Sequence, residues 1–241
     1  MNNVVIFIFI FVAAIFVKIA ANILKFDNYS IELKNPRQNG LIGLAVILII
    51  EVIDICNCSY TSKHIMGLEY TIIAALQELL PVILVLYFQH DTIESIGLTS
   101  KNLLRSFFLS LSLIALLLVT VHFFIIPNGM YYPVSKKISL LINYLIVGFY
   151  EEIAFRGFLQ TRLIAGWGQL KRVGLTAIIC ALIHIPSRLI YQQGINNAII
   201  SSLALIPCAL LFGYIMLKAK NIVAPAIFHA GFDWLDIVII Y

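Results

Sequence analysis

Charged side chains are scarce in this chain: lysine, arginine, aspartate and glutamate make up 12% of its 241 residues. An ordinary soluble domain has about 25%. Hydrophobic residues make up 61%. Apolar windows of roughly 20 residues, long enough to cross a hydrocarbon core about 30 Å thick, recur along the whole length. The sequence therefore predicts an integral, multi-pass membrane protein and not a soluble one.

Long polar segments, internal repeats, low-complexity tracts and Pro/Gly/Ser-rich linkers are also missing. No room is left for a soluble domain. We predict a single all-α membrane domain over residues 1–241, a bundle of about eight transmembrane helices that encloses a polar cavity near mid-membrane. The second and sixth predicted spans are short and can extend into their flanks. The expected spans are Asn3–Leu24, Leu41–Ile55, Leu68–Phe88, Leu104–Ile126, Ile138–Leu159, Val173–Ile185, Asn197–Leu217 and Ile222–Tyr241.

Several catalytic motifs are absent as well. There are only four cysteines, and the isolated C-x-C of Cys56 and Cys58 has no second pair that would complete a zinc motif. Cys180 and Cys208 lie in apolar segments, where packing is the usual role. The chain has no H-E-x-x-H and no G-x-S-x-G. Zincin-type metalloprotease and serine-hydrolase mechanisms are therefore disfavoured.

Basic residues are present, but they are unevenly distributed between the loops. Ten lie in the first, third, fifth and seventh loops: Lys25, Lys34, Arg37, Lys101, Arg105, Arg162, Lys171, Arg172, Lys218 and Lys220. Four lie in the even loops: Lys63, Lys136, Lys137 and Arg188. By the positive-inside rule, the odd loops are expected in the cytoplasm and both termini outside. The membrane would be the cell membrane if the source is bacterial.

Ionisable residues within the spans are candidates for function, because each is costly in lipid. Glu51 and Asp54 are three residues apart and share one helical face. They could relay protons or bind a cation, but a hydrogen-bonded pair near a helix end is the favoured interpretation. Glu69 and Glu78 are assigned no role.

The stretch "GFYEEIAFRGFLQTRL" places two glutamates and an arginine in the fifth span. Glu152 and Arg156 are at i and i+4, with the acid first, which is the favourable order for a helical ion pair. Glu151 has no basic residue at i+3 or i+4, so its carboxylate must face another helix or water. Glu151 is therefore the candidate general base, and Glu152 with Arg156 is a supporting pair.

Two further motifs carry histidines. "CALIHIPSR" has His184 two residues before Pro186, an expected helix terminus, and "HAGFD" has His229 and Asp233 at i and i+4. Counted from the nearest basic loop residues, Glu151 and these three polar residues lie about 14 to 20 Å below the face that carries the odd loops. We expect all four to line one pocket that opens towards the cytoplasm.

Such a set supports two chemistries. In one, Glu151 activates water with help from His184, while His229 donates a hydrogen bond to the developing oxyanion. In the other, Glu151, His184 and His229 bind zinc, whose water attacks the substrate. These residues form no compact zinc spacing, so the version without a cofactor is favoured, no metal ligand is assigned, and zinc stays the alternative.

The three motifs resemble those of the CAAX protease and bacteriocin-processing (CPBP, or Abi) family of intramembrane proteases, which includes Rce1-like enzymes. "EEIAFRG" is similar to the family's E-E-x-x-x-R, "CALIH" to its F-x-x-x-H, and "HAGFD" to its H-x-x-x-N or H-x-x-x-D. The resemblance covers residues 94–236. Cys180 replaces the usual aromatic, and Asp233 replaces the commoner asparagine. Asp233 must therefore be protonated, or else orient His229 by accepting its ring N–H.

The resemblance implies a hydrolase, an intramembrane endopeptidase that is often described as a metalloprotease. Glu151 and His184 would activate water, His229 and Asp233 would stabilise the oxyanion, and Glu152 and Arg156 would maintain the site. The expected partners are membrane lipid and a peptide or lipidated-protein substrate, either of CAAX type or another membrane-associated peptide, and not nucleic acid. The oligomeric state is not predicted.

Two alternatives stay open. A catalytically silent scaffold or bacteriocin-immunity protein could keep this fold. A small transporter could use Glu51, Asp54 and Glu151 as a proton path, although the chain lacks the paired broken-helix repeats of such transporters.

Overall fold

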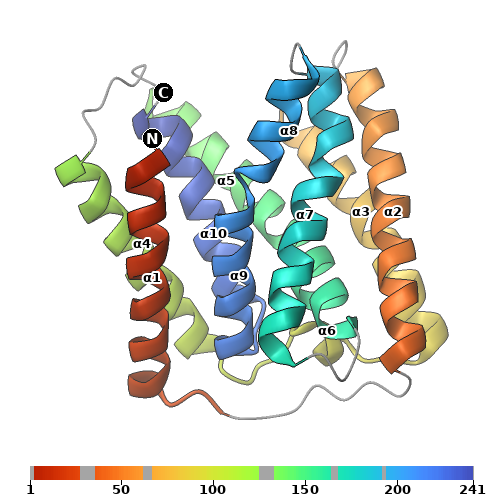
Figure 1. Ribbon diagram of the computed structural model, residues 1–241, viewed down its shortest axis with the longest axis horizontal. Helices are drawn as coiled ribbons and strands as arrows, with labels where there is room; N and C mark the ends of the chain where they lie inside the picture. The colour runs from red at the N-terminus through yellow and green to blue at the C-terminus, as the bar shows by residue number, and fades with distance from the viewer. Residues whose placement is uncertain are drawn as a thin grey trace.

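The computed structural model describes residues 3–27, 36–61, 67–124, 133–163, 168–191 and 194–240, and within these ranges the chain is helical with short connections and no strand. Figure 1 shows the long helices side by side in one bundle. In chain order the elements are α1 (Asn3–Leu24), α2 (Pro36–Thr61), α3 (Leu68–Gln89), the 3₁₀ helix η1 (Ile93–Ile96), α4 (Leu103–Phe124), α5 (Val134–Glu152), the π-helix η2 (Ile153–Leu159), α6 (Gln160–Arg162), α7 (Gln169–Tyr191), α8 (Ile195–Leu203), α9 (Ile206–Ala219), α10 (Val223–Leu235) and the π-helix η3 (Asp236–Ile240).

The helical membrane bundle predicted from the sequence is confirmed. Seven segments of the described chain are long and apolar enough to cross a membrane: Val4–Leu24, Asn39–Asn57, Leu68–Gln89, Leu103–Phe124, Val134–Arg162, Gln169–Ile190 and Ile195–Ala219. The eighth predicted span is present as α10 and η3 but is not among the seven, and α10 itself has 13 residues.

One detail of the prediction was wrong. The sixth span does not end at Pro186, because α7 continues through that proline to Tyr191. A proline removes one backbone donor, but ending the helix within lipid would expose several more unsatisfied groups, so the helix continues. The seventh predicted span is present as the apolar segment Ile195–Ala219, and a turn at residues 204–205 divides it into α8 and α9.

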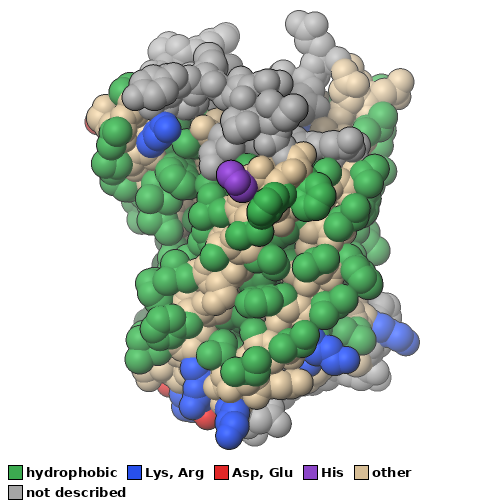
Figure 2. Space-filling model, turned by 90° about the vertical axis from the view of Figure 1, so that its left-hand side faces the viewer, with side chains coloured by type: hydrophobic (Ala, Val, Ile, Leu, Met, Phe, Trp, Pro, Cys, Tyr) green, Lys and Arg blue, Asp and Glu red, His purple; other side chains and the backbone are tan. Residues whose placement is uncertain are grey.

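The faces of the bundle agree with a membrane setting. Figure 2 shows hydrophobic side chains over the middle of one face and most of the Lys and Arg side chains of that view at its lower end. The two chain ends lie together at the opposite, upper end in Figure 1. This arrangement matches the uneven loop charge. The side of the membrane to which each end belongs stays a prediction.

The interior has two apolar clusters. One cluster lies beneath α2, η2 and α7, and the other joins α1, α4, α9 and α10. α10 packs against both α5 and α4, while α2 packs against α3 and α7. This topology brings α2, α3, α5, α7 and α10 around the second half of the fifth span.

Gly148 allows α5 and α10 to pack closely. A Cβ at this position would lie 2.6 Å from the carbonyl oxygen of Ala226 and 3.1 Å from the backbone nitrogen of Ala230. Both contacts are with backbone, which cannot rotate away. Gly148 is one helical turn before Glu152, so the distance between the helices here sets how near Glu152 comes to α10.

We therefore expect Gly148→Ala to lower the free energy of unfolding by about 1 to 3 kcal/mol, as overpacking does. The measurement is thermal or denaturant unfolding of the purified protein in detergent. Gly174→Ala on α7 is the matched control, because a Cβ there meets no atom of the described chain within 4 Å. That variant should be neutral or slightly stabilising. Equal stability of the two variants would show that Gly148 is not a packing contact.

Candidate active site

The two glutamates of the fifth span lie where its helical geometry changes. α5 ends at Glu152, and the next seven residues form the π-helix η2. Such wider turns are rare and occur frequently at functional sites. Gly157 lies inside η2, where a Cβ would come 2.5 Å from the carbonyl oxygen of Ile96. The glycine thus lets η1 pack directly against the π-helix. The sequence pattern, read at 3.6 residues per turn, did not predict this change.

The expected ion pair of Glu152 and Arg156 is present and fully buried. Arg156 Nη1 donates to Glu152 Oε1 at 2.8 Å, and the two side chains are 2% and 0% exposed. Arg156 Nη2 also donates to the carbonyl oxygen of Ala209 on α9 at 3.3 Å. The guanidinium lies 5.4 Å from the ring centre of Phe212, a distance typical of a cation–π contact. The pair therefore ties η2 to α9.

Glu152 has a second partner that the sequence did not predict. The same Oε1 lies 2.9 Å from Nδ1 of His229. On the other edge of the ring, Nε2 of His229 lies 3.3 Å from Oδ2 of Asp233 and 3.9 Å from Oε2 of Glu151. A ring with protons on both nitrogens can donate to Glu152 and to Asp233, whereas a neutral ring can donate to only one of them. Carboxylates thus hold the ring at both edges.

Phe212 fixes the plane of the same histidine. Its ring stacks on His229 with centroids 4.7 Å apart and an interplanar angle of 23°. The aromatic ring therefore lies beside both His229 and Arg156. No sequence signal pointed to Phe212, because one phenylalanine in an apolar span has many equivalents.

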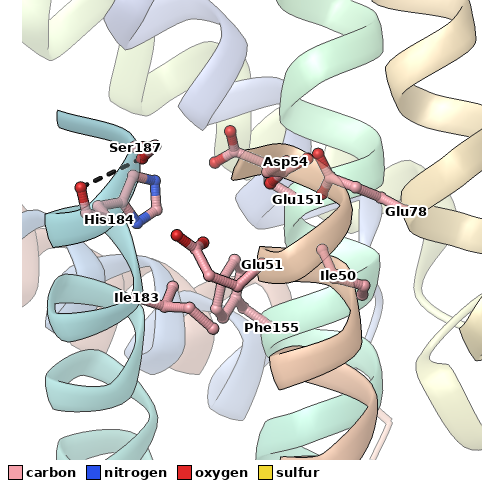
Figure 3. Close-up of a pocket in the computed structure, with 9 residues that line it drawn as sticks. All are labelled: Ile50, Glu51, Asp54, Glu78, Glu151, Phe155, Ile183, His184 and Ser187. Atoms are coloured by element: carbon pink, nitrogen blue, oxygen red, sulfur yellow. Dashed lines mark hydrogen bonds between the residues drawn. The ribbon is translucent and has the colours of Figure 1, made fainter. Parts of the chain in front are cut away.

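Glu151 lines a pocket together with His184. The pocket has about 330 Å³ of empty space. Figure 3 shows its lining, which comes from α2, α3, α5, η2 and α7. The lining residues are Ile50, Glu51, Asp54, Glu78, Glu151, Phe155, Ile183, His184 and Ser187. The Glu151 side chain is 22% exposed, in contrast to the fully buried Glu152. Of the two adjacent glutamates, Glu151 is the one that a substrate or water can reach.

The ring of His184 is oriented by its own helix. Nδ1 lies 2.7 Å from the carbonyl oxygen of Cys180, one turn earlier in α7. Because a carbonyl only accepts, Nδ1 carries the proton, and in the neutral ring Nε2 is left as an acceptor. Ser187 Oγ donates to the backbone carbonyl of His184 at 3.2 Å. Backbone contacts of α7 therefore set the tautomer of this residue.

The four predicted site residues are connected through Glu151 and His229, but they do not all line one pocket. His184 shares the pocket with Glu151, whereas His229 and Asp233 are not among its lining residues. They approach Glu151 from α10, with 3.9 Å between Nε2 of His229 and Oε2 of Glu151. Glu151 is the residue common to both groups.

Three more carboxylates reach the pocket. Glu51 and Asp54 on α2 line it instead of forming an isolated pair at a helix end, and so does Glu78 on α3, which had been assigned no role. The three-residue spacing of Glu51 and Asp54 was a usable signal, because it placed both on one helical face. Glu78 had no such signal, since its neighbours in space lie on other helices.

The residues do not fit the zinc alternative. Among the described residues, no group of three His, Cys, Asp or Glu side chains is placed to hold a metal ion. Nδ1 of His184 is directed at a carbonyl, and both nitrogens of His229 face carboxylates. The zinc ligands considered from the sequence, Glu151, His184 and His229, are therefore not assembled as a ligand set.

Comparison with known families agrees with the motifs. Residues 133–235 match the family model described as type II CAAX prenyl endopeptidase Rce1-like. No curated protein and no solved structure matches the chain. The matched segment runs from the start of α5 to the end of α10 and contains Glu151, His184, His229 and Asp233. The family model that matches is the one that the three motifs resemble, and the match covers residues 133–235, which is less than half of the 241 residues.

Proposed function

We propose that this protein is an intramembrane endopeptidase that hydrolyses a peptide bond beside Glu151. The observation that carries the proposal is the position of Glu151, an accessible carboxylate that lines a pocket with His184 and lies 3.9 Å from His229. Around it, the buried pair of Glu152 and Arg156 holds the other edge of His229. This arrangement offers a base, a second acceptor and a hydrogen-bond donor around one reacting centre.

Water in the pocket is the proposed nucleophile. Glu151 accepts one of its protons, with Nε2 of His184 as the second acceptor that orients it. The water oxygen bonds to the carbonyl carbon, and the carbonyl oxygen becomes an oxyanion. When the C–N bond breaks, Glu151 returns the proton to the leaving nitrogen. The products are a carboxylic acid and an amine, which exchange a proton to become a carboxylate and an ammonium group, and Glu151 is again a carboxylate.

His229 is the proposed oxyanion donor. Its Nε2 lies 3.9 Å from Glu151, and Asp233 at 3.3 Å keeps the Nε2–H directed into the site until a substrate oxygen replaces Asp233 as its acceptor. Asp233 thus acts through His229 as a positioning residue, and it need not be protonated for this role. Phe212 and Glu152 restrict the ring so that little reorganisation is needed during the reaction.

The substrate class that we propose is a peptide at the membrane, either the C-terminal segment of a prenylated CAAX-type protein or another membrane-associated peptide. The family description, a CAAX prenyl endopeptidase, supports the first. The location of the site between apolar helices supports both substrate classes. A lipid anchor would hold the peptide at the depth in the membrane at which Glu151 lies.

Cleavage by the purified protein tests the proposal. In lipid vesicles, the wild type should cut a farnesylated CAAX-type peptide or its unprenylated form. We expect His184→Gln to lower the rate by about 100-fold or more, since the assisting base is lost. His122→Gln is the matched control, because His122 is exposed on α4 outside the site. Product masses identify the bond that is cut.

Two outcomes would count against this mechanism. Loss of cleavage with a chelator, restored by zinc, would assign the water activation to a metal. If neither peptide is cut, and a partner protein co-purifies equally with wild type and His184→Gln, the protein is a scaffold and not a protease.

A further inference from the structure

The pocket beside Glu151 is more acidic than the proposed reaction requires. Hydrolysis uses Glu151, yet Glu51, Asp54 and Glu78 also line the space. All three precede residue 133, so they lie outside the matched Rce1-like segment. The N-terminal helices α2 and α3 therefore add a feature of their own to the site.

Two of these carboxylates are almost completely buried. Glu51 is 9% exposed and Glu78 is 5% exposed. Oε1 of Glu51 is buried and has no hydrogen-bond partner in the described part of the chain. In Figure 3 the Glu51 carboxylate is turned into the pocket on the side of His184, while Asp54, Glu78 and Glu151 gather on the other side. A buried acceptor without a partner is costly, and this one faces a space that a ligand can enter.

Acidic side chains outnumber basic ones in the pocket. Four of its nine lining residues are carboxylic acids, and the single basic side chain among the nine is His184. Arg188 on α7 is half-buried but does not line the space. Between helices, where the dielectric constant is low, like charges this close repel strongly. A cation placed among them would receive hydrogen bonds and attraction from several sides.

The other walls of the pocket are apolar. Ile50, Phe155 and Ile183 contribute them. The pocket is small, since its roughly 330 Å³ of empty space includes solvent at the opening, and this suits one side chain better than a large ligand. An apolar stem that ends in a positive charge matches this combination, and lysine and arginine have that shape.

We propose that the pocket is a subsite for a lysine or arginine side chain of the substrate, held by Glu51, Asp54 and Glu78 next to the bond that Glu151 hydrolyses. This inference rests on the proposed protease function, because the bound side chain belongs to the substrate. Binding of the cationic side chain itself does not require catalysis. It makes α2 and α3 the part of the protein that selects the substrate, and the Rce1-like segment the part that cuts it.

The test uses pairs of short apolar peptides in which one lysine is moved along the sequence, each paired with a peptide that has norleucine at the same position. Norleucine keeps the apolar stem and lacks the charge. Dissociation constants and kcat/KM are measured for both peptides with the wild-type protein in lipid vesicles. At one position, we expect the lysine peptide to be preferred by about 10- to 100-fold, which is the range for hydrogen bonds to a charged group.

Removing the carboxylates should remove the preference. Glu51→Gln and Glu78→Gln keep the side-chain shape, and each should reduce the lysine-to-norleucine ratio by about tenfold. A general loss of folding would weaken the binding and cleavage of both peptides equally and leave the lysine-to-norleucine ratio unchanged. The ratio is therefore the diagnostic quantity. Glu69→Gln on α3 is the matched control, because Glu69 is exposed in the first turn of the helix, away from the pocket. If Glu78→Gln does not fold, the lysine-to-norleucine ratio is measured in Glu51→Gln and Asp54→Asn instead.

The outcomes separate this inference from the proposed function. Equal affinity and equal cleavage of every lysine and norleucine pair would overturn the subsite and leave the protease intact. An unchanged ratio in the folded Gln and Asn variants would also overturn it. A lysine preference in binding that the variants lose, with no peptide cut, would support the subsite and reject the protease.

Discussion

Glu151→Gln should lower kcat for peptide cleavage by about 10²- to 10⁴-fold, the range for loss of a general base. Glutamine has nearly the shape of glutamate but cannot accept a proton from water. The Glu151 side chain is 22% exposed, whereas Glu152 forms a fully buried ion pair, so the fold should not depend on Glu151 as it does on Glu152. The measurement is the single-turnover rate of the purified variant in lipid vesicles.

Glu94→Gln is the control for this variant. Glu94 is exposed in η1, and its nearest ion pair, with Lys101 at 3.9 Å, is at the surface, so cleavage should not change. Glu151→Asp is a second variant, which keeps the carboxylate but shortens the side chain by one methylene. Its cleavage rate should lie between those of the wild type and Glu151→Gln. Cleavage by folded Glu151→Gln at the wild-type rate would show that the base is another group.

Glu152→Ala should lower the free energy of unfolding by about 3 to 5 kcal/mol, because it leaves Arg156 as a buried charge without its carboxylate. The two side chains are 0% and 2% exposed, so water cannot replace the lost partner. The same substitution removes the group at Nδ1 of His229. The cleavage rate and the free energy of unfolding should therefore both fall. The free energy is measured by unfolding of the purified protein in detergent.

The chain contains a matched exposed ion pair for comparison. Arg105 Nη1 and Asp27 Oδ1 are 2.9 Å apart, almost the same distance as in the buried pair, but the two side chains are 40% and 63% exposed. Asp27→Ala should cost about 1 kcal/mol or less. A similar loss for both substitutions would show that burial does not determine the strength of the Glu152 pair.

A double variant separates the two roles of Glu152. In Glu152→Ala with Arg156→Met, no buried charge is left unpaired, so much of the stability should return. His229 still lacks its partner at Nδ1, so cleavage should stay low. Recovery of both stability and cleavage would mean that Glu152 serves only to neutralise Arg156 and does not position the histidine.

Interactions within one helix could be read from the sequence. Glu152 with Arg156 and His229 with Asp233 are both at i and i+4, and both pairs are close in the structure. The helical repeat places such residues on one face whatever surrounds them. For the same reason, the long apolar spans predicted the membrane bundle, and the motif spacing predicted the family.

Contacts between helices were decided by the tertiary structure alone. Glu152 bonds to His229 across 77 residues of sequence, Phe212 of α9 stacks on that histidine, and Glu78 of α3 joins Glu151 in the pocket. In lipid, an apolar helix face does not reveal its partner, because lipid tails and neighbouring helices are equally apolar. Close packing at positions such as Gly148 decides which faces meet. The membrane fold class and the candidate residues thus followed from the order of residues along the chain, whereas the packing of the helices placed Glu151 in the acidic pocket and beside His229.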